Sequence, residues 1–146
     1  MIAYLDSSVV VRTYLRDEQG HAEAATLVSD PNIAVVTSTL TRIEVAGALV
    51  RAAAAGRGDA DELLELLDAD LREGGSVLLV RPDQIEVESL AERLVRGHPL
   101  RALDALHLAV AHLAVPTLAR PQETIAFATR DEVQASVAEE LGFEVL

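Results

Sequence analysis

Short apolar runs alternate with amphipathic segments along the whole chain. Five runs are strand-like, because they are β-branched or fully apolar and are bounded by turn residues. We expect strands at 2–5, 33–37, 77–80, 125–129 and 143–146. Apolar residues between them recur at i, i+3, i+4 and i+7, which is typical of helices packed on one face. The helices are expected at 9–16, 20–29, 39–54, 59–73, 82–97, 101–113 and 131–141. This alternation predicts an α/β domain with a parallel sheet of about five short strands flanked by about seven helices.

Two of the expected helices differ in how their apolar residues are distributed. The helix at 39–54 has a single stripe that we expect to face the core, with Glu44 at its edge. The members of the stripe are Leu40, Ile43, Gly47, Val50 and Ala54. The helix at 101–113 is apolar around most of its circumference and is expected to be buried. Residues 114–124, which contain Pro116 and Pro121, form the least regular stretch.

Length and composition favour one ordinary globular domain. The chain has 146 residues, of which half are hydrophobic, and it can therefore bury a core unaided. It has no cysteine, which excludes disulfides, thiolate-bound zinc and a cysteine nucleophile. No secretory signal precedes the first strand, and no stretch of about 18 apolar residues free of charge occurs. We expect a soluble, cytoplasmic protein with no membrane association.

The charge balance is unusual for a nucleic-acid binder. The chain carries 24 acidic and 12 basic residues, a net charge of −12, whereas nucleic-acid binders are usually basic. Seven acids crowd the expected helix at 59–73 and are interpreted as a solvated face. All twelve basic residues are arginine, whose planar fork suits phosphate and carboxylate. Local positive patches therefore remain compatible with the composition.

Four acidic residues stand where a site is expected. Asp6 and Asp131 each follow a strand, and ligands of parallel α/β sheets bind at the carboxyl ends of the strands. Asp104 lies on the buried helix, where a charge needs a partner, and Glu44 lies at a stripe edge. Each has a simpler interpretation. Asp6 and Asp131 are also suited to capping the helices that follow them. Glu44 could be a solvated surface residue. Asp104 could be a first-turn acid that is favoured by the helix dipole and paired with Arg101.

Taken together, the four acids indicate a metal site. If the strands before Asp6 and Asp131 are neighbours, the two carboxylates lie at one edge of the sheet. Several carboxylates in one cleft repel each other and stay ionised only with a cation among them. Ligation by oxygen alone selects hard ions, which here means Mg²⁺ or Mn²⁺.

Over essentially its whole length the chain resembles the PIN-domain family, and most closely the VapC toxins of bacterial type II toxin–antitoxin systems. The resemblance rests on four motifs in order: Tyr4-Leu5-Asp6-Ser7-Ser8; Ser38-Thr39-Leu40 leading to Ile43-Glu44-Val45; Leu103-Asp104-Ala105-Leu106-His107-Leu108-Ala109; and Phe127-Ala128-Thr129-Arg130-Asp131. It implies a single PIN-like domain over 1–146. It also implies that Asp6, Glu44, Asp104 and Asp131 hold one or two Mg²⁺ or Mn²⁺ ions, with Thr129 as a supporting hydrogen-bond donor. In many relatives the fourth acid, which corresponds to Asp131 here, is less essential than the others.

The same resemblance implies an activity and partners. The expected activity is that of a metal-dependent endoribonuclease, the toxin of a toxin–antitoxin pair, which hydrolyses RNA to 5′-phosphate and 3′-hydroxyl ends. The expected partners are a second copy of the chain and a cognate antitoxin protein. That antitoxin would cover the surface near helices 8–29 and 39–55 and block the acidic cleft. Three arginines lie within three residues of a proposed ligand and are expected either to contact the RNA backbone or to pair with the acids: Arg42, Arg101 and Arg130.

Other site chemistries lack their residues. Of the four histidines only His107 lies near a proposed ligand, and we expect it to be a hydrogen-bonded core residue. A metal-free ribonuclease would need a histidine pair for acid–base catalysis, which no second histidine supplies. No glycine-rich phosphate loop follows a strand. The main alternative is a non-catalytic PIN-like module that binds RNA or protein.

Overall fold

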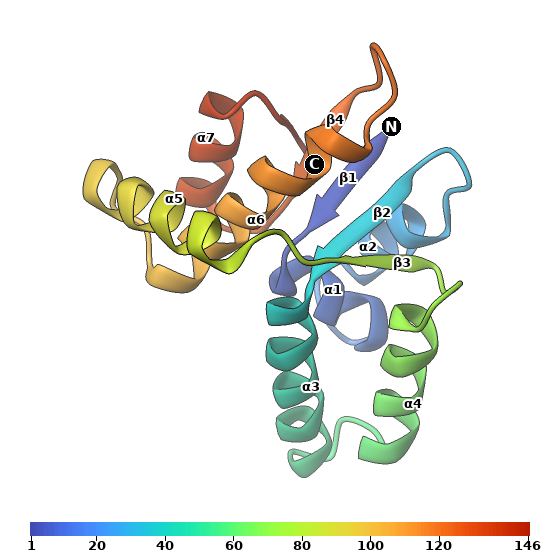
Figure 1. The fold of residues 1–146 in the computed structure, drawn as a ribbon. Coiled ribbons are helices and arrows are strands. Elements are labelled where there is room, and N and C mark those ends of the chain that lie inside the picture. The colour runs from blue at the N-terminus through green and yellow to red at the C-terminus, as the bar shows by residue number, and fades with distance from the viewer.

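The computed structural model describes residues 1–146 and has five strands and seven helices, as expected (Figure 1). The strands are β1 (Ile2–Leu5), β2 (Ala34–Ser38), β3 (Val77–Val80), β4 (Ile125–Ala128) and β5 (Glu144–Val145). The helices are α1 (Ser7–Tyr14), α2 (His21–Ser29), α3 (Thr39–Ala54), α4 (Ala60–Leu71), α5 (Gln84–Gly97), α6 (Ala102–Leu118) and α7 (Glu132–Glu140).

All five strands are parallel, in the order β3-β2-β1-β4-β5. The central strand β1 pairs with β2 on one side and with β4 on the other, where Leu5 is level with Ala128. The carboxyl ends of β1 and β4 are therefore adjacent. This confirms the α/β fold with a parallel sheet, and it places the residues that follow these two strands at one edge.

The sheet separates two apolar cores. Along β1, Ile2 and Tyr4 belong to one core, and Ala3 and Leu5 belong to the other, as the alternation of side chains along a strand requires. Helices α5, α6 and α7 cover the first face, whereas α1, α3 and α4 pack on the second (Figure 1). The result is a three-layer arrangement in which both faces of a short parallel sheet are covered.

Helix α3 buries a different face from the one predicted. The buried residues are Thr41, Val45, Leu49 and Ala52. From the predicted stripe, Ile43 is 71% exposed and Val50 is 48% exposed. The helix has two faces of similar polarity, and contacts with α1 and α4 decide which one is covered. Glu44 is still at a boundary, because it lies beside the buried face formed by Thr41 and Val45.

Helix α6 is longer than predicted. It runs to Leu118, so the expectation of irregular structure is wrong for residues 114–118. Pro116 stands in the last turns of the helix, where Ala114 and Val115 are buried against the core. Packing of these two residues outweighs the backbone hydrogen bond that proline cannot make.

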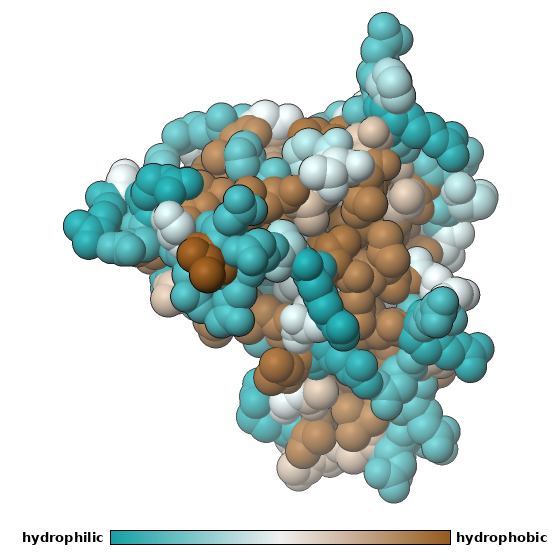
Figure 2. All heavy atoms as spheres, viewed as in Figure 1, coloured by the Kyte–Doolittle hydropathy of each residue, from teal (hydrophilic) through white to brown (hydrophobic).

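Polar and apolar side chains are unevenly spread over the surface. On the face shown in Figure 2, apolar side chains gather over the middle, and hydrophilic ones cover α4 and the far end of α5. Residues Asp59 to Glu73, predicted to be a solvated acidic face, do expose most of their acids. No helix is long and apolar enough to cross a bilayer.

Candidate active site

All four acids singled out in the sequence line one cleft, at the carboxyl ends of β1 and β4. The cleft has a volume of about 370 Å³. Its other walls come from the start of α1 and the start of α6, with Arg101 at the opening. The lining residues are Asp6, Ser7, Ser8, Glu44, Arg101, Ala102, Leu103, Asp104 and Asp131. The fold thus brings together carboxylates from four separate segments.

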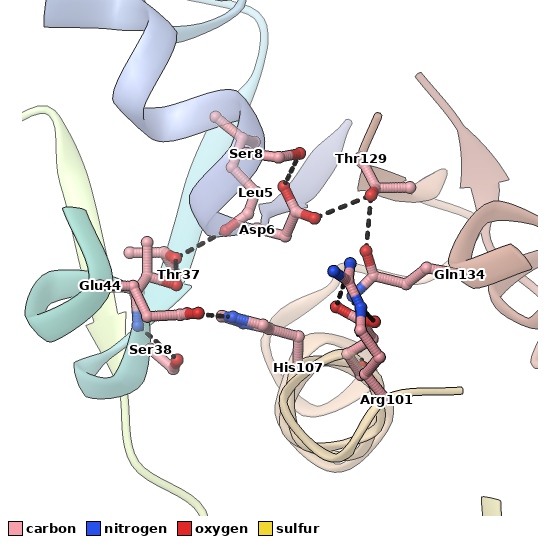
Figure 3. Close-up of polar contacts among 12 residues, drawn as sticks. Leu5, Asp6, Ser8, Thr37, Ser38, Glu44, Arg101, His107, Thr129 and Gln134 are labelled. Carbon is pink, nitrogen blue, oxygen red and sulfur yellow. Dashed lines mark hydrogen bonds and ion pairs between the residues drawn. The ribbon is translucent and has the colours of Figure 1, made fainter. Parts of the chain in front are cut away.

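Asp6 both caps a helix and faces the cleft. Its Oδ1 accepts hydrogen bonds from the Val9 amide at 3.1 Å and from Ser8 Oγ at 2.6 Å, which starts α1. Its Oδ2 lies 2.7 Å from the Thr129 hydroxyl on the other side (Figure 3). The residue is only 4% exposed. Asp6 can therefore cap α1 and line the cleft at the same time, because its two carboxylate oxygens have different partners.

Thr129 connects three parts of the site. Its Oγ1 lies between Asp6 Oδ2, at 2.7 Å, and Gln134 Oε1, at 2.5 Å, and it accepts a bond from the Asp131 amide at 3.1 Å. A hydroxyl has one proton, so it donates to one of these two oxygens at a time. Gln134 Nε2 in turn donates to the backbone oxygen of Asp104 at 3.2 Å. The role predicted for Thr129 as a supporting donor is compatible with this position.

Gln134 is a supporting residue that the sequence analysis did not identify. It is fully buried on α7 and couples Thr129 to the first turn of α6. A signal was present, since Gln134 stands three and four residues before Val137 and Ala138, on a face that is otherwise apolar. A buried polar side chain on such a face needs partners, and here the partners belong to the site.

Glu44 is oriented by a buried histidine. His107 Nε2 lies 2.6 Å from Glu44 Oε2 (Figure 3). Its Nδ1 lies 2.8 Å from the Tyr4 hydroxyl. A carboxylate only accepts, so Nε2 carries the proton, and the Tyr4 hydroxyl donates to Nδ1 when the ring is neutral. His107 is thus the hydrogen-bonded core residue that the sequence predicted, and it also holds a cleft carboxylate in place.

The surroundings of Glu44 favour its charged form. Partial burial by itself would raise the pKa of Glu44, but its hydrogen bond with His107, with contributions from Ser7 and Arg101, lowers it below the usual value. Tyr4 behaves oppositely, because complete burial raises the pKa of its phenol and keeps it a neutral donor. The Tyr4–His107–Glu44 chain therefore ends in a carboxylate directed to the cleft.

Asp104 and Asp131 share a single arginine. Arg101 Nε lies 2.7 Å from Asp104 Oδ2, and Arg101 Nη2 lies 3.3 Å from Asp131 Oδ2. The other oxygen of Asp131 caps α7 by accepting from the Gln134 amide at 2.9 Å. Hydrogen bonding to Asp104 raises the pKa of Arg101, whose side chain is nevertheless 77% exposed. The ion pairing that the sequence left open for Asp104 is present.

The donor set of the cleft fits a hard divalent cation, since four carboxylates face one guanidinium and no sulfur or free imidazole takes part. The side chains as they stand do not converge: nowhere in the chain do three histidine or acidic side chains come close enough to hold a metal ion. Asp104 and Asp131 are instead directed to Arg101. A cation bound by all four acids therefore requires Arg101 to leave them.

The three arginines proposed to contact RNA lie in different places. Only Arg101 lines the acidic cleft. Arg42 is bonded to Asp68 of α4 at 2.7 Å. Arg130 forms no side-chain hydrogen bond or ion pair and lines a separate polar pocket with Arg12.

Comparisons with known proteins agree with this architecture. The PIN domain family model matches residues 3–140. No curated protein sequence matches the chain. VapBC2 from Rickettsia felis, solved with a DNA fragment from its promoter, is similar in structure, with a TM-score of 0.65, 13% identity, and coverage of 100% of this chain and 99% of that one.

Two other solved structures share the fold. VapBC-1 from nontypeable Haemophilus influenzae has a TM-score of 0.55 and 18% identity over 100% of this chain and 97% of that one. A protein of Pyrobaculum aerophilum has a TM-score of 0.57 and 17% identity over 97% and 89%. At identities this low, the solved structures show only that the fold is shared. The family model, in contrast, matches nearly the entire sequence. The chain belongs to the PIN-domain family.

Proposed function

We propose that this PIN-domain protein is a metal-dependent endoribonuclease and the toxin of a type II toxin–antitoxin pair. The observation that carries the proposal is the shared cleft, which the acids of all four family-like motifs line although they come from distant segments. Membership of a family that generally uses divalent metals supports it. The substrate is RNA, cut to 5′-phosphate and 3′-hydroxyl ends.

Asp6, Glu44, Asp104 and Asp131 would hold one or two Mg²⁺ or Mn²⁺ ions. When bound, such an ion neutralises charge on the phosphate and makes water more acidic. The chain's own groups do the rest. Thr129 and His107 hold Asp6 and Glu44 in fixed orientations. A cleft carboxylate accepts the proton of the attacking water, and the Arg101 guanidinium binds a phosphate oxygen of the RNA.

The exposed face of α3 supports a protein partner. Ile43 and Val50 are large apolar side chains exposed to solvent, and Ile43 directly precedes the cleft residue Glu44. Exposed apolar residues beside a functional cleft are typical of a protein interface. We propose a cognate antitoxin on this surface, which blocks the cleft with a basic side chain, and a homodimer of the chain itself. The cytoplasm is the proposed location.

Cleavage of a labelled RNA pool tests the function. Purified wild type, Asp6→Asn and Asp104→Asn proteins are compared in Mg²⁺, Mn²⁺ and EDTA, with 5′-phosphate ends identified on the products. We expect wild-type cleavage that EDTA and each substitution abolish. Cleavage that survives both EDTA and the substitutions would refute the four-acid site.

One observation favours a second candidate, a non-catalytic PIN-like module that binds RNA or protein. The acids do not converge on a common point, and Arg101 neutralises two of them. If no RNA is cut under any of these conditions while wild-type protein still binds RNA or an antitoxin, this second function is the correct one.

A further inference from the structure

We infer a second RNA-binding element beside the acidic cleft: a pocket formed around Arg12 and Arg130 that binds a backbone phosphate of the same RNA strand. This rests on the proposed function, since it names how that substrate is held away from the scissile bond. The pocket has a volume of about 370 Å³, and all of its lining residues are polar or glycine: Arg12, Gln19, Gly20, Glu23 and Arg130.

The two arginine side chains converge over Gly20. A Cβ atom on Gly20 would lie 3.4 Å from Arg130 Nη2 and 3.5 Å from Arg12 Cδ. Gly20 has a φ of +87°, which favours glycine, and it ends the loop that leads into α2. The absence of a side chain there leaves room for both guanidinium groups at one point of the surface.

The positive charge of these arginines is not neutralised by a carboxylate. Arg12 donates from Nε to the Gln19 carbonyl at 2.8 Å and from Nη1 to the Ser8 carbonyl. Arg130 forms no side-chain hydrogen bond or ion pair. Glu23 lines the pocket, but neither arginine forms an ion pair with it, and the pocket keeps an excess of one positive charge. Arg42, Arg57 and Arg101, in contrast, are each paired with an acid.

Arg12 is held in place before any ligand arrives. The carbonyl groups of Gln19 and Ser8 hold the guanidinium in place without cancelling its charge. The backbone carbonyl of Arg12 lies 2.7 Å from His21 Nδ1. A preorganised guanidinium loses less conformational entropy on binding than a free one. Arginine also offers two parallel donors to phosphate oxygens. Arg12 therefore supplies the half of the pocket that hydrogen bonds hold in place, whereas the Arg130 side chain has no such bond.

The pocket and the acidic cleft have a common wall. Ser8 lines the cleft, its hydroxyl donates to Asp6, and its carbonyl accepts from Arg12. The Ser8 hydroxyl also accepts a bond from the Arg130 amide at 3.1 Å. Arg130 stands in sequence between Thr129, which bonds to the cleft residue Asp6, and Asp131, which lines the cleft, whereas its side chain reaches Gly20 at the start of α2. The pocket is therefore adjacent to the cleft that would hold the scissile phosphate.

Charge explains why an RNA strand is the fitting ligand. A protein of net charge −12 repels a polyanion, and a cleft with four carboxylates repels it most. A phosphate bound to Arg12 and Arg130 offsets that repulsion next to the site of cleavage. Contacts of this kind position the backbone without reading its sequence.

Nuclear magnetic resonance in metal-free buffer tests the inference without relying on cleavage. ¹⁵N-labelled protein is titrated with a single-stranded hexauridylate and, separately, with inorganic phosphate. We expect the oligonucleotide to shift the Gly20 amide and the Arg12 and Arg130 side-chain signals. Arg130→Gln should weaken its binding about fivefold and reduce the slope of log affinity against log salt by about 0.7. The matched control is Arg120→Gln, which removes the same charge from the opposite end of the sheet.

Each outcome decides between the proposals. Oligonucleotide shifts at Gly20 that Arg130→Gln diminishes and Arg120→Gln leaves unchanged support the pocket. Shifts confined to the acidic cleft, or equal effects of the two substitutions, overturn the pocket and leave the nuclease intact. Inorganic phosphate binding as tightly as the oligonucleotide overturns the assignment to an RNA strand. Absence of both RNA binding and RNA cleavage overturns the pocket together with the proposed function.

Discussion

The two halves of the acidic cleft are held in opposite ways. On one side, Asp6 and Glu44 are bonded to the buried side chains of Thr129 and His107. On the other side, Asp104 and Asp131 share Arg101, which is largely exposed. The first pair is held by hydrogen bonds to side chains inside the protein. The second pair is directed to a group that solvent, a cation or a phosphate can replace.

This difference follows from the energetics of the partners. An ion pair exposed to water is weak, because solvent and salt screen it, so Arg101 leaves its acids at little cost. Disrupting a buried hydrogen bond leaves an unsatisfied group and costs about 1–3 kcal/mol. The cleft therefore combines two acids held by buried partners with two acids held by one exposed arginine. Four predictions test this contrast.

Replacing Asp6 should be far more damaging than replacing Asp131. We expect Asp6→Asn to lower RNA cleavage about 1000-fold or more, because it removes a charge from the pair held by buried partners, at its most buried point. Asp131→Asn should lower it about tenfold, since asparagine still caps α7. Single-turnover cleavage rates measure both. Asp59→Asn, which alters the α4 cap outside the cleft, is the control and should have no effect. Equal losses at Asp6 and Asp131 would contradict the contrast.

Removing His107 should impair cleavage through Glu44. His107→Ala is expected to lower kcat about 10- to 100-fold, as loss of a supporting partner of a metal ligand does. It should also reduce the free energy of unfolding by about 2–3 kcal/mol, because Tyr4 and Glu44 lose their shared partner. Denaturant titration and kinetics separate the two effects. His112→Ala, an exposed histidine on the same helix, is the control. Tyr4→Phe should give a smaller loss of kcat than His107→Ala.

Arg101→Gln should have opposite effects on the two ligands of the cleft. Mn²⁺ should bind up to about fivefold more tightly, since the ion no longer competes with an exposed ion pair. The KM for RNA should rise, because a phosphate contact is lost. Calorimetric titration of Mn²⁺ and steady-state kinetics measure the two effects. Arg96→Gln breaks an exposed ion pair to Glu92 outside the cleft and should change neither. Weaker Mn²⁺ binding by Arg101→Gln would refute competition.

The stability contribution of Glu44 should depend on pH. Since the folded state lowers the pKa of Glu44, its ionised form stabilises the fold above the unfolded value of about 4.3, and this contribution is lost as the pH falls through the lower folded pKa. We expect Glu44→Gln to lower the Tm by about 2 °C at pH 7, and the difference from wild type to shrink below pH ~4. Thermal scans from pH 3 to pH 7 measure it. A difference that grows on acidification would show that the sign is wrong.

Local patterns were sufficient for most of the architecture. The positions of all five strands and seven helices followed from short apolar runs and helical spacing, since these signals act over a few residues. The placement of Asp6 and Asp131 beside each other followed from the carboxyl-end rule for parallel strands, once β1 and β4 proved to be neighbours. Assignment of the four acids as metal ligands stays a prediction.

Partners from distant segments could not be read from local patterns. Glu44 and His107, or Thr129 and Asp6, are far apart along the chain, and no periodicity indicates that they meet. The same holds for Arg101, which lines a cleft with four acids and pairs with two of them. Arg12 and Arg130 come from opposite ends of the sequence and form one pocket only because α1 lies beside the end of β4.

The sequence by itself determined the order of the elements and the family-like motifs. Only the tertiary structure decided which face of α3 is buried, how far α6 continues beyond Pro116, and how the cleft acids are divided between buried and exposed partners. The physical reason is the distance along the chain over which each effect acts. Propensity and capping depend on neighbouring residues, whereas burial and pairing depend on whichever segments the sheet brings into contact.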